Sequence, residues 1–208
     1  MKKILKRIMT MGLIAILSLV IISCEKKSEI TPEESLNIYM GILISENKEG
    51  IEKIGLSDAE FFSIISLRNE GFKMGVASDP AIKKSLDDKL TEDLLTSVTT
   101  AMKKVEFNAV SSEINGDNAI VNVEVRGLDF EKIMDDTIED MTKDITKYSG
   151  MSEDEINREV MKTFIIYIGK AEIKNEKKTV IINMKKDKKG EWQIEKEEVE
   201  TLIKSIME

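Results

Sequence analysis

The 208-residue sequence contains no histidine and only one cysteine. Without histidine, catalytic sites built on a serine–histidine or cysteine–histidine pair are excluded, as are histidine-based zinc sites. The sequence also lacks a Gly-Lys-Ser/Thr phosphate-binding loop and a Gly-x-Ser-x-Gly nucleophile elbow. A single cysteine allows no disulfide within the chain, so folding must depend on the apolar core. We therefore expect no cofactor, no metal ion and no catalytic residue.

Basic side chains are scarcer than acidic ones, at 31 lysines and arginines against 39 aspartates and glutamates. The first 23 residues contain four of the basic residues and none of the acidic ones, so the remainder holds 27 against 39. A nucleic-acid-binding protein needs a basic face to neutralise phosphates. We therefore predict that nucleic acid is not a partner.

The N-terminal segment has the composition of an export signal. Lys2, Lys3, Lys6 and Arg7 form a basic start, and residues 8–22 carry no charge and are mostly aliphatic. A stable transmembrane helix needs about 20 apolar residues, and here charged residues return at Glu25. Export is therefore favoured over a permanent membrane span.

The cysteine lies where this apolar segment ends, in the sequence Ile21-Ile22-Ser23-Cys24. This segment resembles the lipobox of bacterial lipoproteins. The resemblance implies cleavage between Ser23 and Cys24, a diacylglyceryl group on the Cys24 sulfur, and acylation by fatty acids such as palmitate. It places the protein at the cell membrane, lipid-anchored on the extracytoplasmic side. The alternative is an incidental thiol at the end of an uncleaved signal anchor.

The predicted organisation is a signal peptide over residues 1–23, a lipid-anchored tether over 24–30 and a single domain over 31–208. A domain of this length buries enough surface to be stable without disulfides. Its first helix is expected to begin at Thr31, because the following proline suits the first helical position and Glu34 can complete a capping box.

Two more helices are predicted before any strand. The second should begin at Ser57, which is followed three residues later by Glu60 in another capping box. The third should run on from Asp79 as one continuous helix, because apolar residues recur at four-residue steps. These residues are Ile82, Leu86, Leu90, Leu94 and Val98.

From Lys104 the apolar residues alternate with polar ones, which indicates β-strands. A turn is predicted at residues 115–117, and a helical hairpin over 128–174 is expected to separate this strand pair from a second one. A Ser-x-x-Glu capping box at Ser152 should start the second helix of that hairpin. The apolar residues of the later strands are Ala119, Val121, Val123, Val125, Val180, Ile182, Met184, Trp192 and Ile194.

The predicted fold class is α+β: N-terminal helices packed on a curved antiparallel sheet of about four strands, a helical hairpin between the strand pairs, and a C-terminal helix. The alternating strand at 117–123 and the ending Lys188-x-Gly190-x-Trp192-x-Ile194 resemble a family of uncharacterised lipoproteins from low-GC bacteria. That family is related to nuclear-transport-factor-two-like, or cystatin-like, domains. The resemblance implies a curved sheet around a helix and an apolar pocket at its mouth, which the 128–174 insertion could cover or fill.

Carboxylates are the remaining candidates for chemistry. Asp136, Asp140 and Asp144 are predicted to lie a turn apart on one helix, beside Asp135 and Glu139. Such a stripe could attract a hard cation such as calcium. The alternative is a solvated helix face opposite the apolar one, which is the commoner arrangement and the one that we predict.

Two functions are therefore compatible with the sequence. We predict a non-enzymatic, membrane-anchored binding module whose partner is an envelope protein or a small apolar ligand, because the residues that usually carry chemistry are missing. The alternative is a carboxylate-based or metal-dependent enzyme on the same fold. That alternative requires acidic groups from different elements to converge in a cleft.

Overall fold

A computed structural model describes residues 30–188 and 190–207. Helix α2 (Pro32–Met40) begins as predicted, with the Thr31 hydroxyl accepting a hydrogen bond from the Glu34 N–H at 3.2 Å. It continues into a π-helical segment, η1 (Gly41–Ser45), which ends at Glu46. Glu46 has a φ of 53°, in the left-handed region that residues other than glycine rarely adopt. A 3₁₀ turn, η2 (Ile51–Ile54), follows.

The second predicted helix is confirmed as α3 (Asp58–Ser78), and Ser57 and Glu60 form its capping box. The predicted continuous third helix is wrong: it is divided into α4 (Pro80–Ser85) and α5 (Asp88–Met102). The Asp87 side chain accepts a hydrogen bond from the Leu90 N–H at 2.8 Å and so caps a new helix. The four-residue apolar spacing continues from α4 into α5 because Leu86 and Leu90, on either side of the break, are both buried.

As predicted, the strands form one antiparallel sheet; their order in it is β1-β2-β3-β4. Their bounds are β1 (Glu106–Asn115), β2 (Asn118–Arg126), β3 (Lys178–Lys186) and β4 (Trp192–Ile194). Val123 on β2 lies opposite Ala109 on β1 and Val180 on β3, so the predicted apolar rows coincide on one face. The register of β1 against β2 shifts between Ala109 and Ser111, where Val110 forms a bulge.

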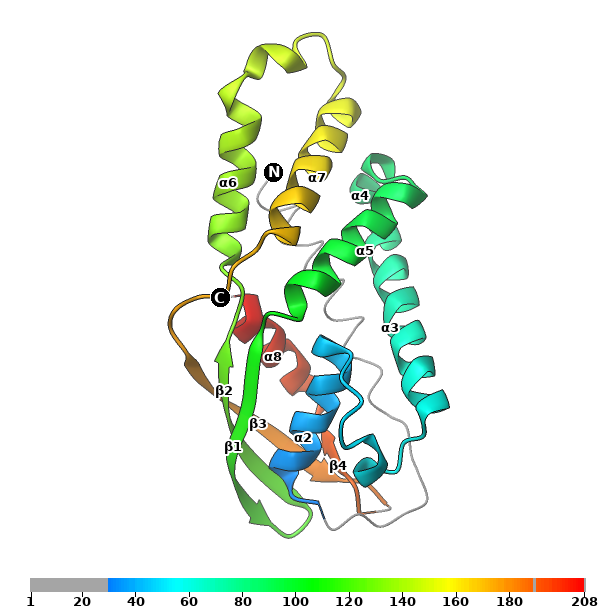
Figure 1. Ribbon diagram of the computed structural model, residues 1–208, viewed down its shortest axis with the longest axis vertical. Coiled ribbons are helices and arrows are strands. Elements are labelled where there is room, and N and C mark those ends of the chain that lie inside the picture. Colours follow the sequence, from blue (N-terminus) through cyan, green and yellow to red (C-terminus); the bar gives the residue numbers. More distant parts are fainter. Residues whose placement is uncertain (1–29, 189, 208) are drawn as a thin grey trace.

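Between β2 and β3 lie α6 (Phe130–Lys143), the 3₁₀ turn η3 (Ile145–Tyr148) and α7 (Glu153–Gly169). The predicted capping box at Ser152 is confirmed. The two helices project from one end of the molecule, with the sheet at the other (Figure 1). Helix α7 packs on α4 and α5 rather than on the sheet. The insertion therefore extends the helical layer and takes no part in covering the sheet.

The inner sheet face is covered by α2 and by the C-terminal helix α8 (Lys196–Met207) (Figure 1). Of the predicted N-terminal helices, α2 packs on the sheet, while α3 and α5 pack around η1. The end of α8 comes so close to Gly127 that a Cβ there would lie 2.2 Å from the Ile206 carbonyl oxygen. The Leu128 N–H donates to that same oxygen at 2.8 Å. Glycine is therefore required where β2 leaves the sheet.

Candidate binding pocket

The predicted lipid attachment at Cys24 and the cleavage site between Ser23 and Cys24 lie outside the residues that the structure describes. Within residues 30–188 and 190–207, none of the helices combines the length and the apolar character that crossing a bilayer demands.

The acidic residues of α6 are exposed or partly exposed and lie beside lysines of the same segment. Asp136 pairs with Lys132 at 2.9 Å, and Glu139 pairs with Lys143 at 3.5 Å. Among the described residues, no group of three acidic or cysteine side chains is arranged to hold a metal ion. The stripe has the local ion pairs of a solvated helix surface.

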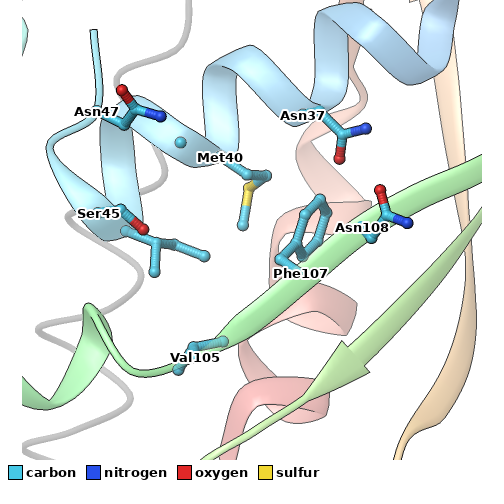
Figure 2. A pocket seen from close by; sticks show the side chains of 9 residues that line it. Asn37, Met40, Ser45, Asn47, Val105, Phe107 and Asn108 are labelled. Atoms are coloured by element: carbon cyan, nitrogen blue, oxygen red, sulfur yellow. The ribbon is translucent and has the colours of Figure 1, made fainter. Parts of the chain in front are cut away.

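A cavity of about 410 Å³ lies between the α2–η1 segment and the start of β1. Figure 2 shows Asn37 and Met40 on the helix side facing Val105 and Phe107 on the strand side. The full lining is Asn37, Met40, Gly41, Ile44, Ser45, Asn47, Val105, Phe107 and Asn108. These described lining residues offer amides, a hydroxyl and apolar groups, and none of them titrates. The pocket can therefore provide hydrogen bonds and apolar contact but no acid–base group.

Sequence reasoning placed no site here, because residues 37–47 and 105–108 meet only in the tertiary structure. The local sequence signal was a glycine, Gly41, inside a predicted helix. A second hollow of about 460 Å³ adjoins the pocket and shares Asn37, Gly41 and Asn47 with it. That hollow is lined by charged residues as well, including Glu34 and Lys53. The neutral pocket thus opens beside a polar and charged rim.

The helix α2 protects the free edge of β1 with its side chains. The Asn37 amide nitrogen donates to the Ala109 carbonyl at 3.2 Å, and the Asn37 amide oxygen accepts from the Ala109 N–H at 2.8 Å. One turn earlier, Glu33 lies beside Ser112. Burial alone would raise the pKa of the Glu33 carboxyl, but hydrogen bonds from its own N–H, from Thr31 and from Ser112 lower it.

The π-helical segment beside the pocket is fixed by a buried arginine on α3. Arg68 is 1% exposed; its Nη1 donates to the Leu43 carbonyl at 3.0 Å and its Nη2 donates to Glu46 Oε1 at 2.6 Å. Lys103 Nζ binds the other Glu46 oxygen at 2.6 Å. Burial by itself would raise the pKa of the Glu46 carboxyl, but Lys103 and Arg68 lower it. This network stabilises Glu46 in its left-handed conformation and so positions η1.

Two aromatic residues that could have formed a ligand wall belong to the core instead. Tyr39 and Trp192 are both buried. The Trp192 carbonyl accepts a hydrogen bond from the Ser35 hydroxyl at 3.4 Å, and the Lys186 ammonium lies 4.8 Å from the Trp192 ring centre. Ser35 and Trp192 therefore join α2 to the edge strand β4.

Comparison with known proteins finds one family and one lipoprotein, which matches in both sequence and structure. The model of DUF5105, described as a domain of unknown function, matches residues 22–207. YcdA, an uncharacterised lipoprotein of Bacillus subtilis strain 168, is 26% identical over 166 residues, which are 78% of this chain and 46% of YcdA. A crystal structure of YcdA matches with a TM-score of 0.63 at 21% identity, covering 85% of this chain and 56% of that one.

The chain spans about half the length of the curated relative that it matches. The YcdA structure shares the α+β fold, and the expected resemblance to uncharacterised lipoproteins of low-GC bacteria is confirmed. Because the family model extends from residue 22 to residue 207, it includes every helix and strand described above. The chain therefore belongs to the DUF5105 family, a family of domains of unknown function.

Proposed function

We propose that this protein is a non-enzymatic binding lipoprotein of the cell envelope, which binds a small neutral ligand in the pocket between η1 and β1. The observation that carries the proposal is the pocket itself. Its volume of about 410 Å³ falls within the usual range for small-molecule sites, about 300–1,000 Å³. Its lining combines apolar walls with a few hydrogen-bonding groups, which is the composition typical of such sites.

The chemistry of the lining favours binding over catalysis. General acid–base catalysis needs a titratable group near the reacting atoms, and the described lining residues contain none. Two carboxylates are adjacent to lining residues in the chain: Glu46 is paired with Arg68 and Lys103, and Glu106 is paired with Arg126. A charged ligand would lose its hydration without gaining a partner in the pocket. The ligand is therefore neutral and has both polar and apolar parts, a refinement of the purely apolar ligand expected from the sequence.

The proposed division of the chain is the one predicted from the sequence. Residues 1–23 form a signal peptide, Cys24 carries the lipid, residues 24–30 form the tether, and 31–208 form one domain. The lipoprotein relative supports this anchoring. At about 3.3–3.6 Å per residue, a seven-residue tether spans at most about 25 Å. The domain would therefore stay close to the membrane on its extracytoplasmic side.

Cys24→Ser is expected to leave an unlipidated precursor, because serine offers no sulfur for the diacylglyceryl group. In a bacterial host, the unchanged protein should be recovered with membranes, and its N-terminal peptide should begin at Cys24 and carry lipid mass. Two acyl chains anchor firmly, since each buried CH2 contributes about 0.8 kcal/mol. Mass spectrometry of that peptide is the measurement, and Ser23→Ala, which keeps a small residue before the cysteine, is the control. A processed protein with a free Cys24 thiol would contradict the proposed anchor.

Neutral fragments are expected to bind the pocket of the full-length protein in detergent micelles. Acetamide, N-methylacetamide, 1,2-propanediol and benzyl alcohol serve as probes, with acetate and methylammonium as charged controls. For fragments of this size we expect dissociation constants on the order of 1–100 mM. The measurement is saturable NMR shifts of the Asn47 side-chain amide and the Met40 methyl group, with Ile181 on the outer sheet face unaffected. If no neutral fragment gives saturable shifts there, or the charged controls bind as well, the proposed function fails.

A further inference from the structure

Three residues of the helical segment face the free edge of β1 in succession. Glu33, Asn37 and Gly41 are spaced four residues apart and so lie on one side of the helix. Four helical residues rise about 6 Å, which matches the rise of about 6.6 Å for two strand residues. Glu33 therefore lies beside Ser112, Asn37 beside Ala109 and Gly41 near Phe107. The β-bulge at Val110 accounts for the extra residue between Ala109 and Ser112.

The main chain of Phe107 points toward this helix. In an antiparallel ladder, alternate residues direct both their N–H and C=O to the same side. Ala109 directs both groups to Asn37, so Phe107, two residues earlier in the same register, directs its groups away from β2 as well. Within residues 30–188 and 190–207, neither the N–H nor the C=O of Phe107 has a hydrogen-bond partner outside the sheet.

Gly41 leaves room where the other two helix positions carry a polar side chain. A Cβ built on Gly41 would meet only the Asn47 Cβ, at 3.8 Å. The space opposite Phe107 is the pocket of about 410 Å³ (Figure 2). The edge is thus capped by side chains at Ser112 and Ala109 and left open at Phe107.

Asn37 shows which chemical group fits such an edge. Its primary carboxamide presents an oxygen and an N–H side by side and binds both main-chain groups of Ala109, at 2.8 and 3.2 Å. A trans secondary amide points its N–H and C=O in opposite directions and cannot make both bonds to one residue. A carboxamide, or a ring amide held in the cis form, matches the pair of groups that Phe107 offers.

We propose that the pocket binds a neutral ligand through a cis donor–acceptor amide, either a primary carboxamide or a lactam, that pairs with the main-chain N–H and C=O of Phe107. The inference rests on the proposed function and specifies its ligand class. Gly41 determines this specificity because it supplies no side chain of its own to the edge. The apolar remainder of the ligand contacts Met40, Ile44 and Val105, which line the same pocket.

The test compares acetamide and 2-pyrrolidinone with N-methylacetamide, the trans control, on the full-length protein in micelles. Both cis amides should shift the Phe107 N–H resonance saturably and bind at least about fivefold more tightly than the control, the effect of one additional net hydrogen bond. Tighter binding of acetamide identifies a side-chain or terminal carboxamide as the source, and tighter binding of 2-pyrrolidinone identifies a ring amide. Equal binding of the trans control, or no shift at Phe107, would overturn the inference. In that case other neutral fragments could still bind the pocket, so the fragment experiment above would test the proposed function independently.

Substitutions at Gly41 provide the second measurement. The Gly41→Asn side chain should reach Phe107 as Asn37 reaches Ala109, slow hydrogen exchange of the Phe107 N–H, and reduce cis-amide binding at least tenfold. Gly41→Ala is the control: Gly41 has helical φ and ψ of −56° and −44°, which alanine adopts readily, and its methyl group reaches no edge atom. Binding by Gly41→Ala should persist. If Gly41→Asn still bound acetamide like the unchanged protein, the inference would be wrong, and if Gly41→Asn did not fold, the comparison of cis and trans amides would decide.

Discussion

Val123→Asp is expected to abolish cooperative folding. Val123 is 0% exposed and lies in a central strand, opposite Ala109 on one side and Val180 on the other. An aspartate there would bury a charge without a partner, at a cost of several kcal/mol. Domains are stable by only about 5–15 kcal/mol. Circular dichroism of the purified protein during heating should therefore show no cooperative transition.

Ile120→Asp is the matched control for this prediction. Ile120 lies on the same strand, points to the opposite face and is 45% exposed. The aspartate would remain hydrated, so we expect a change in the free energy of unfolding within about 0.5–1 kcal/mol. A cooperative transition of Val123→Asp near that of the unchanged protein would show that the sheet is not packed as described. Equal loss in both variants would show that charge on β2, and not burial, is responsible.

Arg68→Met is expected to lower the free energy of unfolding by about 3–5 kcal/mol, the usual effect of removing one partner of a buried ion pair. The methionine fills much of the same volume but donates no hydrogen bond. The Leu43 carbonyl would lose its bond of 3.0 Å, and Glu46 would lose its bond of 2.6 Å. Because both acceptors belong to η1 and its end, the pocket should be distorted as well. Chemical denaturation gives the stability, and the Phe107 and Asn47 resonances report on the pocket.

Lys103→Met is the control that compares the exposed Lys103–Glu46 ion pair with the buried Arg68–Glu46 pair in their effect on the free energy of unfolding. Lys103 binds the same carboxylate, but its side chain is 46% exposed, so its removal should cost less than about 1 kcal/mol. The pKa of Glu46 is lowered in the folded protein from its ordinary value of 4.5. Its ion pairs therefore stabilise the fold fully at pH values above 4.5. This stabilisation is lost as the pH falls through the lowered pKa of the folded protein. Arg68→Met should therefore lose less stability on acidification than the unchanged protein does. A loss for Lys103→Met as large as that for Arg68→Met would contradict this division.

The local elements followed from residues close together in the chain. Capping boxes at Ser57 and Ser152 set helix starts because the hydroxyl and the carboxylate that form each box are three residues apart. Alternating apolar residues from Ala119 to Val125 identified a strand with one buried face for the same local reason. The class, α+β with a helical insertion between strand pairs, could be read from these elements in order. The break at Asp87 was missed, because the apolar spacing continues through it and only a capping hydrogen bond reveals it.

The sequence by itself determined the α+β class, the order of the elements and the absence of histidine chemistry, and it predicted the export signal with its cysteine. The tertiary structure decided which helices cover the sheet, where the insertion packs, and that a neutral pocket exists. The pocket depends on contacts such as that between Asn37 and Ala109, which are 72 residues apart. Periodicity and capping rules describe interactions within a few residues, while the meeting of distant segments depends on how whole elements share one core. The missing side chain at Gly41 indicates a binding site only when the strand opposite it is known.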